Sequence, residues 1–187
     1  AGNTGPSATT ANFTIDTTAP TVASFTTATA TGSYKQGEAI VITANTSEAI
    51  QSGNTITVTL DTTDTVILTA ASAGTTLVGT YTVGAGDTSA GLTVSSFSIG
   101  TVADTVGNAM SSTTLPAASS IFGTKTIIID TTAPTGAITY SAASPYKQNA
   151  TATVTATFTE ALTTTPKIAI SGVSSVSAIN MSGSGTT

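Results

Sequence analysis

The side chains of this sequence that could do chemistry are its carboxylates. The chain carries nine Asp and Glu residues against four Lys, and it contains no Arg, His or Cys. It therefore lacks the commonest general base, a thiolate nucleophile and the usual zinc ligands. A phosphate-binding Gly-rich loop is also missing. We expect a protein that is not an enzyme and whose chemistry is limited to binding through oxygen.

Oxygen ligands alone favour a hard divalent cation. Calcium accepts about six to eight carboxylate, amide and backbone oxygens, whereas zinc prefers nitrogen and sulfur. The candidate ligands are Asp16, Glu48, Asp87, Asp104, Asn108, Asp130 and Glu160. They lie far apart in the chain, so the elements that carry them decide whether they can meet.

Composition and periodicity both indicate β-strands. Thr supplies 46 of the 187 residues, and 39% of the chain is hydrophobic. Thr is β-branched and favours strands, where apolar residues alternate with polar ones when one face is buried. Such alternation predicts strands over residues 22–27, 39–46, 55–60, 65–70, 76–83, 92–99 and 122–129. A change of phase between Val94 and Phe97 predicts a β-bulge.

The chain repeats itself. Asp-Thr-Thr-Ala-Pro-Thr occurs at residues 16–21 and again at 130–135, and Tyr-Lys-Gln occurs at 34–36 and 146–148. The Glu-Ala pair at 48–49 also recurs at 160–161. A nearly constant offset over many positions is typical of homologous repeats. We expect residues 1–15 to end a preceding repeat, 16–129 to form a complete one, and 130–187 to form the first half of the next, as a section of a longer chain.

Seven short strands in each repeat predict a fold class. Strands of this length, separated by turn residues, are typical of a Greek-key β-sandwich of the immunoglobulin-like kind. The sequence thus predicts an all-β protein made of tandem immunoglobulin-like sandwiches. In the second repeat, Ala152, Val154, Ala156 and Phe158 alternate with Thr in the same way.

The topology of such a sandwich brings the acidic residues together at its two ends. Successive strands run up and down, so Asp16, Glu48, Asp104 and Asn108 should meet at the end that faces the preceding repeat. Asp87, Asp130 and Glu160 should meet at the next junction. Clustered carboxylates repel one another unless a positive charge lies between them, which favours calcium at both junctions.

Each of these residues also has an ordinary structural explanation. Asp before Thr-Thr-Ala-Pro, and the Asp and Asn of Asp104-Thr-Val-Gly-Asn108, are common turn formers. Asp87 could equally belong to a plain loop, and Glu48 and Glu160 to solvated strand ends. Asp61 and Asp64 flank a Thr-Thr turn, and we interpret them as turn formers.

Three motifs carry a family resemblance. Ile15-Asp-Thr-Thr-Ala-Pro20, Ser47-Glu-Ala49 and Asp104-Thr-Val-Gly-Asn108 resemble the bacterial immunoglobulin-like repeats of giant adhesins, biofilm-associated proteins and surface-layer proteins. The likeness extends over essentially the whole chain. It implies an extended array of modules, often stiffened by calcium at the module junctions.

These expectations lead to two main functional hypotheses. In the first, the chain is a non-catalytic stalk of an extracellular cell-surface adhesin or biofilm protein, and its partners are neighbouring repeats of the same chain. In the second, it is a surface-layer or filament subunit that contacts copies of itself. A carbohydrate-binding module fits less well, because Trp is absent and only four Tyr are present. A net charge of −5 argues against nucleic acid. No apolar run approaches the roughly 18 residues of a membrane span.

Overall fold

The computed structural model describes residues 13–141, 151–171 and 176–182, and these residues form an all-β protein. The chain divides into two compact units between Thr131 and Thr132, two residues beyond the boundary expected from the repeat. Residues 1–12, which make up most of the expected preceding tail, lie outside the described residues. The expected turn at residues 146–148 lies outside them as well.

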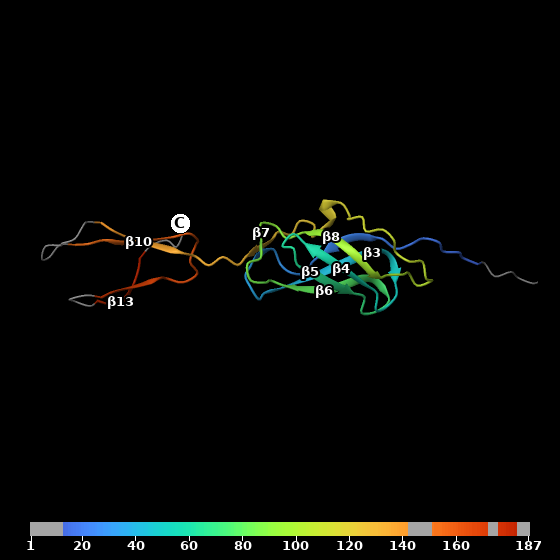
Figure 1. Ribbon diagram of the computed structural model, residues 1–187, viewed down its shortest axis with the longest axis horizontal. Coiled ribbons are helices and arrows are strands. Elements are labelled where there is room, and N and C mark those ends of the chain that lie inside the picture. Colours follow the sequence, from blue (N-terminus) through green and yellow to red (C-terminus); the bar gives the residue numbers. More distant parts are fainter. Residues whose placement is uncertain (1–12, 142–150, 172–175, 183–187) are drawn as a thin grey trace, which may run out of the picture. The chain divides into compact units, whose positions relative to one another are not determined.

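Two sheets build the first unit (Figure 1). Its elements are β1 (Val22–Thr26), β2 (Gly32–Tyr34), β3 (Ala39–Ile50), β4 (Thr55–Leu60), β5 (Thr65–Thr69), β6 (Gly74–Thr82), β7 (Thr88–Ser89), β8 (Val94–Thr101), the 3-10 turn η1 (Ala118–Ser120) and β9 (Ile127–Asp130). Six strands form an antiparallel sheet in the order β1-β3-β6-β5-β4-β8. The other three form a sheet in the order β2-β9-β7, in which β2 runs parallel to β9.

The six-stranded sheet is curled, and the bend lies between β5 and β6. β3 pairs with β6 over almost its whole length, whereas β5 joins β6 through the single pair Thr69 and Val78. Gly79 of β6 permits this close approach, because a Cβ there would lie 2.5 Å from the carbonyl oxygen of Ile67. A sheet folded over in this way is consistent with a β-sandwich.

Strands of both sheets contribute to one hydrophobic core. Its inward-facing residues follow the predicted period of two: Ile40, Ile42 and Ala44 of β3, Ile56, Val58 and Leu60 of β4, and Ile127 and Ile129 of β9 are all buried. Burying one aliphatic side chain of this size contributes about 1.5–3 kcal/mol. Phe25 and Phe97 meet edge to face across the core, with ring centroids 5.9 Å apart. The alternating Thr residues thus form the outer faces of the strands, as predicted.

The expected bulge is present in β8. Thr59 of β4 pairs with Ser96 and Leu60 pairs with Val94, so Ser95 is the additional residue. Both Val94 and Phe97 point inward and are buried because of it.

The prediction for the last strand was wrong over its first half. Phe122 and Gly123 have φ values of 55° and 61°, so the chain turns there and β9 begins only at Ile127. The buried Phe122 side chain holds this conformation, which is uncommon for a residue with a Cβ. Two short strands, β2 and β7, were also not expected, and both owe their existence to pairing with β9.

The second unit contains two antiparallel strand pairs among its described residues. They are β10 (Gly136–Tyr140) with β11 (Val154–Phe158), and β12 (Lys167–Ile170) with β13 (Val176–Asn180). Val154, Ala156 and Phe158 are half-buried between exposed Thr residues, as the alternation predicts, while Ala152 is exposed.

The same pair of hydrogen bonds occurs next to the first strand of each unit. In the first, the Ser47 amide donates to the Thr21 carbonyl (2.9 Å) and the Ser47 hydroxyl accepts from the Thr21 amide (3.0 Å). In the second, Thr159 and Thr135 make the corresponding bonds at 2.9 and 3.0 Å. The sequence repeat is therefore accompanied by a repeated local geometry.

Candidate metal centre

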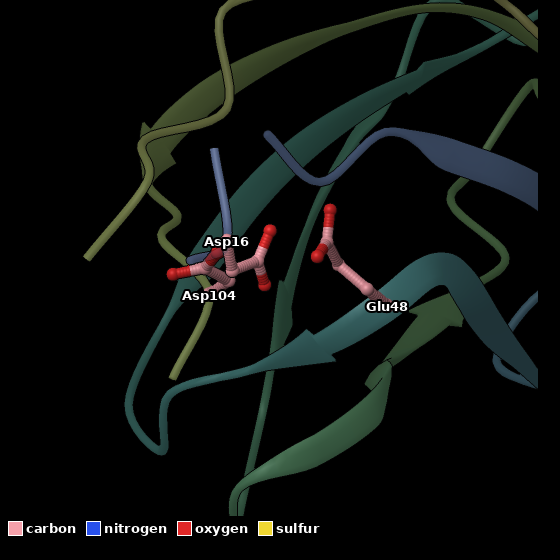
Figure 2. Close-up of side chains that lie close together, drawn as sticks. All are labelled: Asp16, Glu48 and Asp104. Atoms are coloured by element: carbon pink, nitrogen blue, oxygen red, sulfur yellow. The ribbon is translucent and has the colours of Figure 1, made fainter. Parts of the chain in front are cut away.

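Three carboxylates gather where the chain enters the first unit. Asp16 lies in the segment before β1, Glu48 near the end of β3, and Asp104 in the loop after β8. One oxygen of each lies within 4.8 Å of the others, and Figure 2 shows the three side chains converging on one space. The topological argument from the sequence brought these same three residues together.

Asp104 is held rigidly by its own loop. Its Oδ1 accepts hydrogen bonds from the amides of Val106 (2.9 Å), Gly107 (2.6 Å) and Asn108 (2.8 Å), and its Oδ2 accepts one from Asn108 Nδ2 (2.7 Å). The side chain is buried, with 2% of the residue exposed. Burial raises the pKa of Asp104, but the hydrogen bonds from Asn108, Gly107 and Val106 outweigh it and hold the pKa below its ordinary value. Asp104 therefore supplies a fixed negative charge.

Glu48 is the carboxylate left without a partner. It continues the inward phase of β3, in a stretch where the β3–β6 pairing shifts between Asn45 and Ile50. Its Oε1 has less than 1 Å² of accessible surface and no hydrogen-bond partner. Burial, followed by the charges of Asp16 and Asp104, raises the pKa of Glu48. A buried anionic oxygen with no donor is the kind of group that a bound cation would satisfy.

Asp16 joins the entry segment to this cluster. Its Oδ1 accepts a hydrogen bond from the Thr18 amide (3.0 Å), the turn geometry expected of Asp at this position. Its carbonyl oxygen accepts one from Asn108 Nδ2 (3.2 Å). Pro20, four residues later, is buried. The segment from Asp16 to Pro20 is thus fixed to the unit that follows it.

Asn108 supports the cluster in a different way from the one expected. The sequence suggested it as a ligand through its amide oxygen. In the structure its Nδ2 donates both to Asp104 and to Asp16, so it orients one carboxylate and fastens the entry segment. Gln51 also supports this loop, because its Nε2 donates a hydrogen bond to the Asp104 carbonyl oxygen at 2.8 Å. Nothing in the sequence predicted this role for Gln51.

The chemistry of these three residues fits a divalent cation better than any covalent step. Three carboxylates lie close together, and the hydrogen bonds that the described residues donate to their side chains all come from amide groups. Mutual repulsion disfavours such a group unless a positive charge enters it. Carboxylate oxygens without nitrogen or sulfur ligands suit calcium or magnesium. Among the residues that the structure describes, this is the single group of three acidic side chains with such geometry.

The residues expected at the second junction lie as follows. Asp87 is in the loop between β6 and β7, Asp130 ends β9 opposite Thr88, and Glu160 is half-buried after β11 in the second unit. Asp87 Oδ2 already accepts hydrogen bonds from the Tyr81 hydroxyl (2.5 Å) and the Gly84 amide (2.6 Å). A joint metal site of these three residues stays a prediction.

The two acids of the β4–β5 turn have different surroundings. Asp61 accepts hydrogen bonds from the Ser89 hydroxyl (2.6 Å) and the Thr93 amide (3.0 Å), so it ties the turn to its neighbours. Asp64 instead has a buried Oδ2 without a hydrogen-bond partner. The sequence assigned both to the turn and gave no sign of this difference.

The fold defines the class of protein as all-β with a curled, sandwich-like first unit. Comparison with known proteins returns no match to a family model, a curated protein or a solved structure. Among the described residues, no helix has the length and apolar character that crossing a membrane requires.

Proposed function

We propose that this chain is a non-catalytic structural section of a long extracellular microbial surface protein, of the adhesin or biofilm-stalk type. Its immunoglobulin-like modules follow one another and give the protein reach and stiffness. Calcium bound by Asp16, Glu48 and Asp104 fixes the entry segment to each module. The geometry of these three carboxylates is the observation that carries the proposal.

Strand connectivity supports the immunoglobulin-like part of the proposal. β1, β3 and β6 form one side of the bend between β5 and β6, and β5, β4 and β8 form the other. Chain-consecutive β3 and β4 therefore lie on opposite sides of the bend, and β3 pairs instead with β6. Such crossing connections between two layers are typical of a Greek-key sandwich.

Repetition supports the array. The Asp-Thr-Thr-Ala-Pro-Thr segment comes directly before β1 and again before β10, and the hydrogen bonds between Thr21 and Ser47 recur between Thr135 and Thr159. A module that carries its own entry segment and repeats head to tail extends a chain by one module length at each repeat. The work of such a chain is mechanical.

Calcium would act on the connection between modules. Asp16 belongs to the entry segment, whereas Glu48 and Asp104 belong to the body of the unit. A cation that binds all three joins the segment to the body by strong, oriented bonds, and it removes the repulsion among them. Loss of the cation would leave Asp16 joined to the body of the unit by the Asn108 hydrogen bond, a weaker attachment.

Thermal unfolding of the 187-residue chain tests this role. Saturating calcium should raise the melting temperature of the first unit by about 5–10 °C over chelator, since a ligand at about a hundred times its Kd stabilises appreciably. Glu48→Gln should abolish the shift. Glu38→Gln is the matched control, because Glu38 Oε2 accepts a hydrogen bond from the Lys35 amide away from the cluster. An equal shift in both variants would rule out the site.

Sedimentation velocity separates the stalk from a self-assembling subunit. A stalk section should remain monomeric at high concentration with and without calcium. Concentration-dependent growth into oligomers would instead favour a surface-layer or filament subunit.

A further inference from the structure

The strand pair β10–β11 of the second unit corresponds to the pair β1–β3 of the first. Ala156 of β11 follows Ala44 of β3 at the same offset as the repeated Glu-Ala pair. Ala44 pairs with Phe25 in the first unit, and Ala156 pairs with Ile138 in the second. Ile138 therefore takes the place of Phe25.

The strand pair β12–β13 corresponds in the same way to β4–β5. Ile56 pairs with Leu68 in the first unit, and Ile168 pairs with Ile179 in the second. In the first unit, β6 lies between β3 and β5 and is hydrogen-bonded to both, so it joins the two pairs into one sheet. Among the strands that the structure describes in the second unit, the two pairs are separate sheets and the position of β6 is open.

The inward face of the second unit is correspondingly exposed. Phe25 and Val58 are fully buried in the first unit, whereas their counterparts Ile138 and Ile170 are 54% and 43% exposed. Tyr140, two residues after Ile138 and therefore on the same face of β10, is 66% exposed. Large apolar side chains gathered on one face mark a surface that another element covers.

We propose that the second unit binds a β6-like strand between β11 and β13. The strand would run antiparallel to β11, as β6 runs to β3. Leu77 of β6 lies opposite Ala44, so the incoming strand should place a large apolar residue opposite Ala156. Main-chain hydrogen bonds would supply affinity, and the alternating inward side chains would supply specificity.

The same repeating chain is the source of this strand. β6 begins with Gly-Thr-Thr at residues 74–76, and Gly-Thr-Thr recurs at residues 185–187, which lie outside the described residues. This assignment rests on the proposed function, in which the modules follow one another along a long chain. The stretch of chain that opens with the second Gly-Thr-Thr would then complete the second unit.

The position of Gly79 distinguishes insertion between two strands from addition to one edge. A Cβ at Gly79 would lie 2.5 Å from the carbonyl oxygen of Ile67 and 2.6 Å from Leu68 Cδ2, both in β5. Because β13 takes the place of β5, a strand inserted between β11 and β13 needs glycine at this position. A strand that only extended the free edge of β11 would accept alanine there.

A synthetic peptide of residues 72–84, which includes all of β6, tests the proposal on the 187-residue chain. Nuclear magnetic resonance spectra of the labelled chain should show one peptide bound, with shifts in β11 and β13 and unchanged core signals in the first unit. Leu77→Asp in the peptide should weaken binding at least about tenfold, because a charge replaces a buried side chain. Gly79→Ala should weaken it comparably. Thr80→Asp is the matched control, since Thr80 lies on the exposed face of β6.

A second pair of variants tests the chain itself. Ala156→Asp, on the half-buried face of β11, should also weaken binding at least about tenfold. Thr157→Asp, on the exposed face of the same strand, should not. The peptide variants leave the chain unaltered, so they decide the question even if Ala156→Asp fails to fold.

Each contrary outcome has its own meaning. Failure of the wild-type peptide to bind, or equal binding of its Leu77→Asp variant, would overturn the proposal. Full binding of the Gly79→Ala peptide would show edge addition in place of insertion, and shifts confined to the first unit would show exchange with β6 itself. Dimers of the chain that the peptide dissociates would assign the strand to a second copy. The calcium test at Glu48 concerns the first unit, so either proposal can fail without the other.

Discussion

Thr21 and Ser47 exchange two hydrogen bonds that join the entry segment to β3. Ser47 directly precedes Glu48, one of the three clustered carboxylates Asp16, Glu48 and Asp104. The Ser47 side chain accepts from the Thr21 amide, and the Ser47 amide donates to the Thr21 carbonyl. The second unit places Thr159 in the position of Ser47 and keeps both bonds. Both Ser and Thr can therefore supply the accepting hydroxyl at this position.

Ser47→Ala should destabilise the first unit by about 0.5–1.5 kcal/mol, because the Thr21 amide loses its acceptor. Ser47→Thr should have an effect within about 0.5 kcal/mol, since the second unit uses Thr there. Urea unfolding at equal calcium concentration measures both. Equal stabilities for the Ala and Thr variants would show that the side-chain hydrogen bond contributes nothing.

Glu48→Gln should make the cation-free protein more stable near neutral pH. The pKa of Glu48 in the folded state is raised above its ordinary value of 4.5 by burial and by Asp16 and Asp104. The charged form therefore costs stability above the folded pKa, and this cost disappears as pH falls below 4.5. Melting curves in chelator should show the variant above the wild type near neutral pH and level with it in acid. A variant that melts below the wild type at neutral pH would contradict the repulsion among the three carboxylates.

Asp104→Asn should destabilise the protein near neutral pH and cease to do so in acid. The folded-state pKa of Asp104 lies below its ordinary value of 3.8, so its stabilising effect is complete above that value. The effect is lost as pH falls through the folded pKa. The difference in melting temperature between wild type and variant should therefore shrink between about pH 5 and pH 2. A difference that stays constant over this range would mean that the carboxylate charge is not what matters.

Gly79→Ala should damage the bend of the six-stranded sheet. Its Cβ would lie 2.5 Å from the Ile67 carbonyl oxygen, a backbone atom that cannot move without separating β5 from β6. We expect a loss of about 1–3 kcal/mol or more in the free energy of unfolding, as for other overpacked positions. Gly91→Ala is the control, because nothing lies within 4 Å of its added Cβ. Similar losses of stability in the two variants would show that the bend does not depend on glycine at position 79.

The sequence determined most of the fold of the first unit because its signal is local. Alternating burial repeats every two residues, so Ile56, Val58 and Leu60 fixed both the bounds of β4 and its inward face. The change of phase at Ser95 located the bulge for the same reason. Because successive strands were expected to alternate in direction, the end of the unit at which each strand begins or ends could also be predicted. Asp16, Glu48 and Asp104 could therefore be brought together without coordinates.

The tertiary structure decided which side-chain oxygens have hydrogen-bond partners and which do not. Strands β2 and β7 exist only because β9 offers them a partner, and the turn at Phe122 exists because the core accepts that side chain. Asp61 and Asp64 look alike in the sequence, three residues apart in one turn. Asp61 accepts hydrogen bonds from Ser89 of β7 and from Thr93 just before β8, whereas Asp64 lies next to Asp87 of the loop after β6. Hydrogen-bond satisfaction depends on neighbours distant in the chain, and a period-two pattern carries no information about them.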